Sequence, residues 1–227
     1  MAANENGTNE KRRFFKVIAK AEKCDTVNRK VIVESVKGSD NKWQHGKWFS
    51  SLSGFITNAT VKEFEYEGET KKKFVIDITD RECVCQLEFS PSFAAYGLIN
   101  ALLNTDLKRE IQIDGWINKT NYVGLGIKYA GESELIKWSL QKEEVPEGVT
   151  FKKPNGKEET DFSNVEAFWV KNFEDKIYPY ANRSNFKGEV MGVPENDFSG
   201  HSEPPADLFL SKDDYKTEGG NDSSLPF

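Results

Sequence analysis

Polar and hydrophobic residues alternate with a period of two along much of the first 140 residues, which is the pattern of strands that bury one face. Residues 73–79 (KFVIDIT) alternate most cleanly, and they follow a β-rich stretch at 52–66 and a turn at Glu67 and Gly68. These segments predict a hairpin. A third strand is expected at residues 83–89, with alternate side chains on opposite faces.

Residues 93–103 (FAAYGLINALL) break this alternation, because they are hydrophobic on nearly all sides and follow Ser90 and Pro91, a favourable helix start. Such a helix must be buried over most of its surface. Two further strands are expected at 109–118 and 122–129. Three strands, one buried helix and two strands form the order of an OB-fold barrel, in which the helix plugs the floor. The alternative is another small β-barrel, or a sandwich with one helix.

The segments before this unit extend the β pattern. Basic and hydrophobic residues alternate at 12–23 and 27–36, which predicts two strands or a strand and its return, and residues 37–47 form a polar connector. The expected fold class is mainly β: an OB-fold-like five-stranded barrel with one helix between strands 3 and 4, extra N-terminal strands, a short C-terminal helix and a disordered acidic tail.

A helix is also predicted at residues 163–177, where Ser163 and Glu166 have the spacing of a capping box. Hydrophobic residues at helical spacing, such as Val165 and Trp169, favour a helix packed on the barrel over one that binds a partner. Four parts are therefore expected: a disordered N-terminus at 1–10, an OB-fold-like domain with an N-terminal strand extension at 11–142, an extension with one helix packed on the barrel at 143–194, and a disordered acidic tail at 195–227.

The net charge of −6 is unevenly distributed along the chain. Residues 11–129 contain 20 Lys and Arg against 15 Asp and Glu, whereas residues 195–227 contain eight acidic residues against two lysines. The tail has too few aliphatic residues to fold by itself, and its charges repel one another. A basic body joined to an acidic arm indicates a protein that handles a polyanion, because the arm competes for the same surface.

Aromatic and basic residues are expected to gather at two turns. Trp116 should point to solvent near Lys119 and Tyr122, on a face that Gly124 and Gly126 keep open to a flat ligand. Single-stranded nucleic acid needs this combination, since Lys and Arg contact phosphates and exposed rings stack on bases. For each ring the alternative is packing at the barrel rim, and for the lysine run it is a solvated hairpin tip. The predicted nucleic-acid-binding residues are Arg12, Arg13, Lys16, Trp43, Lys47, Trp48, Tyr66, Lys71, Lys72, Lys73, Phe74, Trp116, Lys119, Tyr122 and Lys128.

Residues suited to catalysis or metal binding are scarce. His45 lies in the polar connector and His201 in the tail, so no Ser-His or Cys-His pair is predicted. Cys83 and Cys85 should share one strand face, and we interpret them as core residues rather than zinc ligands. We expect no enzyme activity, no metal and no cofactor. Three cysteines without an apolar targeting stretch or a membrane span favour the reducing cytoplasm.

The chain resembles single-stranded DNA-binding proteins, which combine an OB-fold body and exposed aromatic residues with a flexible acidic tail that ends in a hydrophobic tip. Bacterial members end in acidic residues followed by an apolar residue, Pro and Phe, and residues 222–227 (DSSLPF) are similar to that ending. Ser223 and Ser224 replace a run of Asp, and residues 143–192 are aromatic-rich, which favours a divergent, phage-encoded member. The resemblance implies a tip that binds replication and recombination proteins, formed by Asp222, Leu225, Pro226 and Phe227.

These observations predict a protein that binds and protects single-stranded DNA with little sequence preference in replication, recombination and repair. It would act in the bacterial cytoplasm or nucleoid, or in a phage-infected cell. The resemblance also implies that the tail occupies the DNA site when DNA is absent, and a homo-oligomer is compatible with the sequence. The alternatives are an OB-fold adaptor whose rings bind a protein partner, and an RNA-binding or annealing protein.

Overall fold

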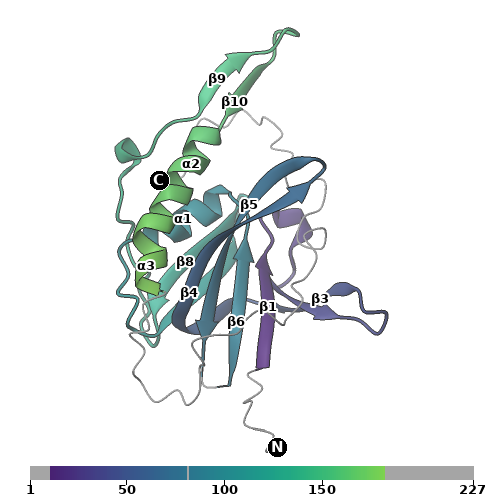
Figure 1. The fold of residues 1–227 in the computed structure, drawn as a ribbon, viewed down its shortest axis with the longest axis vertical. Helices are drawn as coiled ribbons and strands as arrows, with labels where there is room; N and C mark the ends of the chain where they lie inside the picture. Colours follow the sequence, from purple (N-terminus) through teal and green to yellow (C-terminus); the bar gives the residue numbers. More distant parts are fainter. Residues whose placement is uncertain (1–10, 81, 182–227) are drawn as a thin grey trace, which may run out of the picture.

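One eight-stranded sheet that curls around a hydrophobic core dominates the computed structural model, which describes residues 11–80 and 82–181 (Figure 1). The fold is therefore mainly β, as the sequence predicts. In sheet order the strands are β3 (Trp43–Phe49), β2 (Ile32–Lys37), β1 (Lys11–Val17), β6 (Cys83–Phe89), β5 (Glu69–Thr79), β4 (Ser51–Tyr66), β7 (Ile111–Ile117) and β8 (Val123–Tyr129).

The centre of the sheet follows the predicted order of three strands, one helix and two strands. β4, β5 and β6 form an antiparallel meander, and β7 returns to pair with β4 on its other side. The connecting helix α1 (Phe93–Leu102) begins after Ser92, whose Oγ accepts a hydrogen bond from the backbone N–H of Ala95 at 3.2 Å. The helix start thus lies two residues beyond the expected Ser90, at the side chain that caps the first turn.

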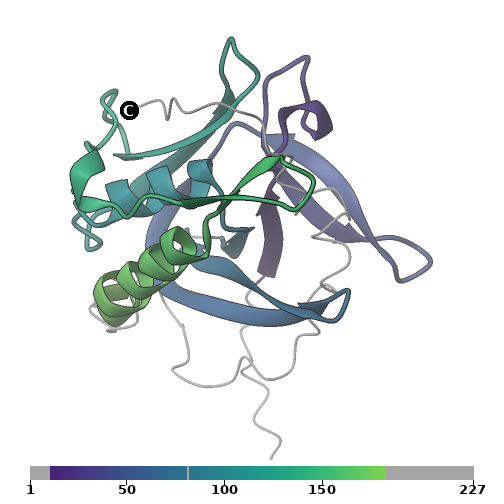
Figure 2. The ribbon, with the colours of Figure 1, turned by 90° about the horizontal axis from the view of Figure 1, so that it is seen from above.

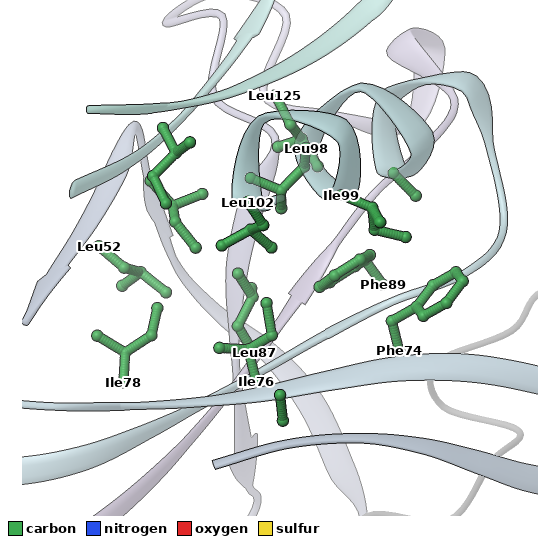
Figure 3. Close-up of a cluster of buried hydrophobic side chains, with 14 of the residues drawn as sticks. Leu52, Phe74, Ile76, Ile78, Leu87, Phe89, Leu98, Ile99, Leu102 and Leu125 are labelled. Carbon is green, nitrogen blue, oxygen red and sulfur yellow. The ribbon is translucent and has the colours of Figure 1, made fainter. Parts of the chain in front are cut away.

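The core lies between α1 and the inner face of the curled sheet (Figure 3). Leu98, Ile99 and Leu102 of α1 point toward the strands, where they meet side chains of β5 and β6 such as Ile76 and Leu87. All five are buried completely or nearly so, because α1 is hydrophobic on the side that faces the sheet.

The N-terminal segment contributes three strands rather than two. β1 pairs with β6 in parallel and with β2 in antiparallel fashion, and β3 extends the meander at the edge of the sheet. The expected polar connector at 37–47 is therefore wrong in its second half, since Trp43 pairs with Lys37 across a hairpin. An isolated bridge between Lys20 and Tyr122 joins the segment after β1 to the start of β8.

The C-terminal part adds a two-stranded hairpin and a helix. β9 (Val149–Lys152) and β10 (Glu158–Asp161) pair with each other, and α2 (Ser163–Asn172) continues through a π-helical turn (Phe173–Ile177) into α3 (Tyr178–Ala181). Both views place α1 and α2 on one side of the molecule, opposite the β2–β3 hairpin (Figures 1 and 2). Short 3-10 helices lie at Ala21–Lys23 and Lys142–Glu144.

Aromatic contacts attach this helix to the sheet and to α1. Trp169 stacks on Tyr96 of α1 with ring centroids 5.8 Å apart, and Phe173 lies 5.1 Å from Phe74 of β5. The predicted capping box does not form, because Ser163 is the first helical residue and its hydroxyl donates to Asp161. In the described part of the chain, every helix falls short of the length and hydrophobicity needed to cross a bilayer.

Candidate nucleic-acid interface

Cross-strand pairing defines a second surface of the sheet, which we call the outer face. Partners across a ladder share a face. Phe14 of β1 is the partner of Ser35 on β2 and of Gln86 on β6, and Gln86 is the partner of Asp77 on β5. Asp77 in turn pairs with Asn58 on β4. One row of side chains therefore crosses five strands, on the side opposite the core and α1.

Aromatic and basic residues gather on this outer face. Alternation along each strand, with the register of the β2–β3 and β4–β5 pairs, places them there. Four of these residues, Phe14, Lys37, Lys62 and Phe64, were not predicted from the sequence. Each is nevertheless separated by an even number of residues from a predicted residue, or from a member of the row above, on the same strand. The aromatic and basic members of the outer face are Phe14, Trp43, Trp48, Phe64, Tyr66, Arg12, Lys16, Lys37, Lys62, Lys71 and Lys73.

Phe14 and Trp43 form the best-defined aromatic group of the outer face. Their rings meet edge to face with centroids 5.4 Å apart, and both are partly exposed. The ammonium of Lys37 lies 5.5 Å from the centroid of the Trp43 ring. Next along β3, exposed Lys47 precedes Trp48, whose ring meets His45 edge to face at 6.1 Å. Partly exposed rings next to exposed ammonium groups are the arrangement that base stacking and phosphate contact require.

Two predicted residues of the hairpin do not contact a ligand on this face. Phe74 has 0% exposure, because its position on β5 points into the core, where it stacks on Phe89 with centroids 5.4 Å apart. Lys73 does belong to the outer face but is only 7% exposed, and its Nζ donates to both carboxylate oxygens of Glu88 at 3.0 and 3.1 Å. The predictions for both residues are therefore wrong: one ring is core, and the ammonium is neutralised by a buried carboxylate.

The basic residues of β1 are divided between the two faces. Arg12 is mostly buried and its Nη2 donates to Asp77 at 2.9 Å, while Lys16 is buried. Arg13 points to the opposite side, where its guanidinium lies 5.0 Å from the Phe15 ring and its Nε donates to Glu34 at 2.8 Å. That hydrogen bond raises the pKa of Arg13 further. The prediction that Arg13 belongs to the interface is wrong, since alternation turns it away from the outer face.

At the tip of the β4–β5 hairpin, lysines are paired with nearby glutamates. Lys71 contacts Glu69, and Lys72 lies 3.6 Å from Glu63 on the neighbouring strand. Tyr66 is partly exposed at the end of β4. Exposed pairs of this kind are weak and readily exchange for a phosphate, so Lys71 and Lys72 stay candidates for phosphate contact.

The second predicted cluster lies at the far end of the sheet, on β7 and β8. Ile111, Ile113 and Ile117 are buried, which leaves Trp116 36% exposed on the other side, as the alternation predicts. Tyr122 is 52% exposed. These residues flank a tight turn that the side chain of Asn118 stabilises. Its Oδ1 accepts hydrogen bonds from the backbone N–H groups of Thr120 and Tyr122.

The two predicted lysines of this cluster, Lys119 and Lys128, differ in exposure and in ion pairing. Lys119 is exposed at the turn, whereas Lys128 is half-buried and its Nζ lies 2.8 Å from a carboxylate oxygen of Asp114. Lys119 is therefore available to a phosphate, while Lys128 is held on the strand by its ion pair.

The glycines of β8 do not leave an open surface. A Cβ on Gly124 would come within 2.4 Å of the Trp116 ring, and one on Gly126 within 3.1 Å of that ring and 3.0 Å of Leu135. The expectation of a glycine face open to a ligand is therefore wrong, because the indole itself lies over the glycine backbone. A base would therefore stack on the exposed ring of Trp116 and not on the glycine backbone.

The predicted partner-binding residues Asp222, Leu225, Pro226 and Phe227 lie outside the described residues, as do the two segments expected to be disordered. Comparisons with known proteins give no relative: no family model, no curated protein and no solved structure matches the chain. Any assignment of function therefore depends on the geometry of the outer face and of the β7–β8 turn.

Proposed function

We propose that the protein binds single-stranded DNA with little sequence preference and protects it in replication, recombination and repair, without catalysing a reaction. The observation that carries this proposal is the group of Phe14, Trp43 and Lys37, in which partly exposed rings and an ammonium occupy the same face. Rings stack on any base, and lysines contact phosphates irrespective of sequence, so such a face favours non-specific binding to a single strand.

The sheet topology supports the finer proposal of an OB-fold. β4, β5 and β6 are consecutive strands, and β7 returns through α1 to lie beside β4. The spatial order β7-β4-β5-β6 is that of a Greek key, on which the five-stranded OB-fold barrel is built. β8 completes the five strands next to β7, and the turn between them carries Tyr122 and Lys119, the position where OB-folds place a ligand-binding loop.

A second part of the proposal concerns the acidic tail. Residues 195–227 carry eight acidic residues, and the chain ends in Leu225, Pro226 and Phe227. An apolar segment beside acidic residues suits a hydrophobic pocket with a basic rim on another protein. We assign this tail the recruitment of replication and recombination proteins, and competition with DNA for the basic body.

Titration of oligo-dT into the full chain, followed by tryptophan fluorescence, tests the DNA proposal. We expect quenching at low salt, an affinity that falls steeply as salt rises, and weaker binding to duplex of the same length. Absence of quenching at low salt, or equal affinity for duplex, would overturn the proposal. Competition with an RNA of matching sequence decides between the two nucleic acids, and preference for RNA would instead favour the RNA-binding alternative.

A further inference from the structure

Three metal-ligating side chains meet at the turn that joins β5 to β6. The Sγ atoms of Cys83 and Cys85 lie 3.6 Å apart, and Cys83 Sγ lies 4.0 Å from Oδ2 of Asp80. The three ligand atoms all fall within 4.8 Å of one another. The cysteines point to the same side of β6 because they are two residues apart on a strand.

The carboxylate of Asp80 is fixed by the backbone of the turn. Its Oδ1 accepts the backbone N–H groups of Glu82 at 2.7 Å and of Cys83 at 2.8 Å. The backbone N–H of Asp80 donates to the carbonyl of Cys83 at 3.2 Å, which closes the turn. Oδ1 is thus occupied, and Oδ2 is the oxygen directed at the thiols. Hydrogen bonds of this kind orient a ligand before a metal binds.

The separations agree with the geometry of a zinc site. Zinc bound tetrahedrally at about 2.3 Å from each sulfur holds two sulfurs roughly 3.8 Å apart. The distance of 3.6 Å between Cys83 and Cys85 is close to that value. Two sulfurs with one carboxylate oxygen form a borderline-soft ligand set that suits Zn²⁺ better than Mg²⁺ or Ca²⁺, which prefer oxygen alone.

The charge around the turn is also compatible with a bound ion. Two thiolates and a carboxylate around Zn²⁺ give a net charge of −1. Arg13 is the cross-strand partner of Cys85 on β1, so its guanidinium lies on the same face and compensates that charge. Its Nε also donates to Glu34 at 2.8 Å, which takes up part of that positive charge.

We propose that Asp80, Cys83 and Cys85 bind one Zn²⁺ ion, with solvent in the fourth position of the tetrahedron. Both thiols release their protons on binding, and no oxidation or reduction takes place. The ion ties the β5–β6 turn to one end of the sheet beside β1. Cys83 and Cys85 are buried in the core, as the sequence predicts, and this assignment adds metal binding to that role. It does not depend on nucleic-acid binding.

Zinc uptake by the reduced, chelator-treated full chain is the direct test, measured by calorimetry and by elemental analysis after gel filtration. We expect one zinc per chain, a higher melting temperature with zinc than without it, and a sulfur-to-metal charge-transfer band when Co²⁺ replaces Zn²⁺. The C83S and C85S variants should each lose this band, and D80N should bind at least tenfold more weakly.

The matched control is C24S, which removes a half-buried thiol that donates to the carbonyls of Ile18 and Lys20 instead. C24S should take up zinc as the unmodified chain does. Circular dichroism of each variant without metal shows whether it is folded. The proposal is overturned if the folded, reduced chain takes up no zinc, if C83S with C85S binds as well as the unmodified chain, or if C24S alone abolishes uptake.

Discussion

The indole ring of Trp116 on β7 lies over the backbone of Gly124 on β8, at a distance where a single added Cβ would come within 2.4 Å of the ring. The two residues are cross-strand partners, so the glycine allows the ring to lie flat against the neighbouring strand. Only a residue without a side chain permits this contact. The orientation of an exposed tryptophan is therefore determined by a glycine on another strand.

G124A should displace the Trp116 ring and weaken binding of single-stranded DNA. We expect a shifted tryptophan emission and a loss of binding free energy of up to about 1–3 kcal/mol, the contribution of one stacked base. G97A is the matched control, since its Cβ would meet the Trp138 ring at 3.5 Å, an ordinary contact. Unchanged DNA affinity in G124A, together with a shifted emission, would remove Trp116 from the interface.

W43A should lower DNA affinity on the order of 1–3 kcal/mol, because the ring that rests on Phe14 would no longer stack on a base. The salt dependence of binding should stay the same, since no phosphate contact is removed. W138A is the control: Trp138 is exposed, but it lies against α1 at Gly97 rather than on the outer face. Equal losses in W43A and W138A would show that the outer face is not the binding surface.

K73A should destabilise the fold strongly, because it leaves the carboxylate of Glu88 buried without its ammonium partner. Removing one member of a buried ion pair costs about 3–5 kcal/mol, and here the side chains of Lys73 and Glu88 are 8% and 3% exposed. Urea denaturation measures the change. K72A, which removes the more exposed pair with Glu63, should cost less than about 1 kcal/mol. A small decrease in the free energy of unfolding for K73A would mean that water reaches Glu88 in the folded protein.

E166Q should stabilise the protein at neutral pH. Burial raises the pKa of Glu166 in the folded state, and the nearby Lys72 and Lys71 offset this only in part. A raised carboxyl pKa means that stability is greatest below the unfolded pKa and declines as pH rises through the folded one. E166Q removes that decline, so its advantage in melting temperature should appear at pH 7 and vanish at about pH 3.5.

An exposed glutamate in the continuation of the same helix supplies a comparison for this measurement. Glu174 is exposed in the π-helical turn, so E174Q should leave the melting temperature nearly unchanged at both pH values. An advantage of E166Q that is the same at both pH values would show that packing, and not ionisation, is responsible.

Deletion of residues 222–227 should preserve or strengthen binding of single-stranded DNA, because the acidic tail competes with DNA for the basic body. It should also abolish recruitment of partner proteins, because these residues form the proposed partner-binding segment. Oligonucleotide titrations of the full and shortened chains at the same salt concentration test the first part. Weaker binding after the deletion would contradict competition by the tail.

The sequence predicts the strands best where burial on one face imposes alternation. Residues 111–117 alternate between buried and more exposed side chains along β7. Residues 73–79 also form a strand, but its side chains are buried on both faces of the sheet. β3 and β9 were missed for different reasons: the pattern of β3 is interrupted by His45 and Gly46, whereas β9 has only four residues and a Pro-Asn-Gly turn follows Lys153. Such edge strands bury little and form because a neighbouring strand pairs with them.

The candidate site could be predicted only in part, because strand pairing determines which residues meet. Alternation along single strands is enough to place Trp116 outside and Ile113 inside. It does not show that Phe14 shares a face with Trp43, or that Glu88 lies within reach of Lys73, since these contacts join strands from separate parts of the chain. Strand pairing therefore decides which lysines are neutralised by a carboxylate on another strand and which stay exposed, and the sequence alone does not distinguish the two groups.

The parallel pairing of β1 with β6 joins distant parts of the chain. Lys11 is the partner of Cys83, so this pair closes a long loop between the first described strand and the β4–β6 meander. Closing such a loop carries an entropic cost, and non-local pairings of this kind slow folding. β2 and β3 reach the sheet through β1, so the half of the outer face that contains Trp43 is connected to the meander through this one slow-forming pair.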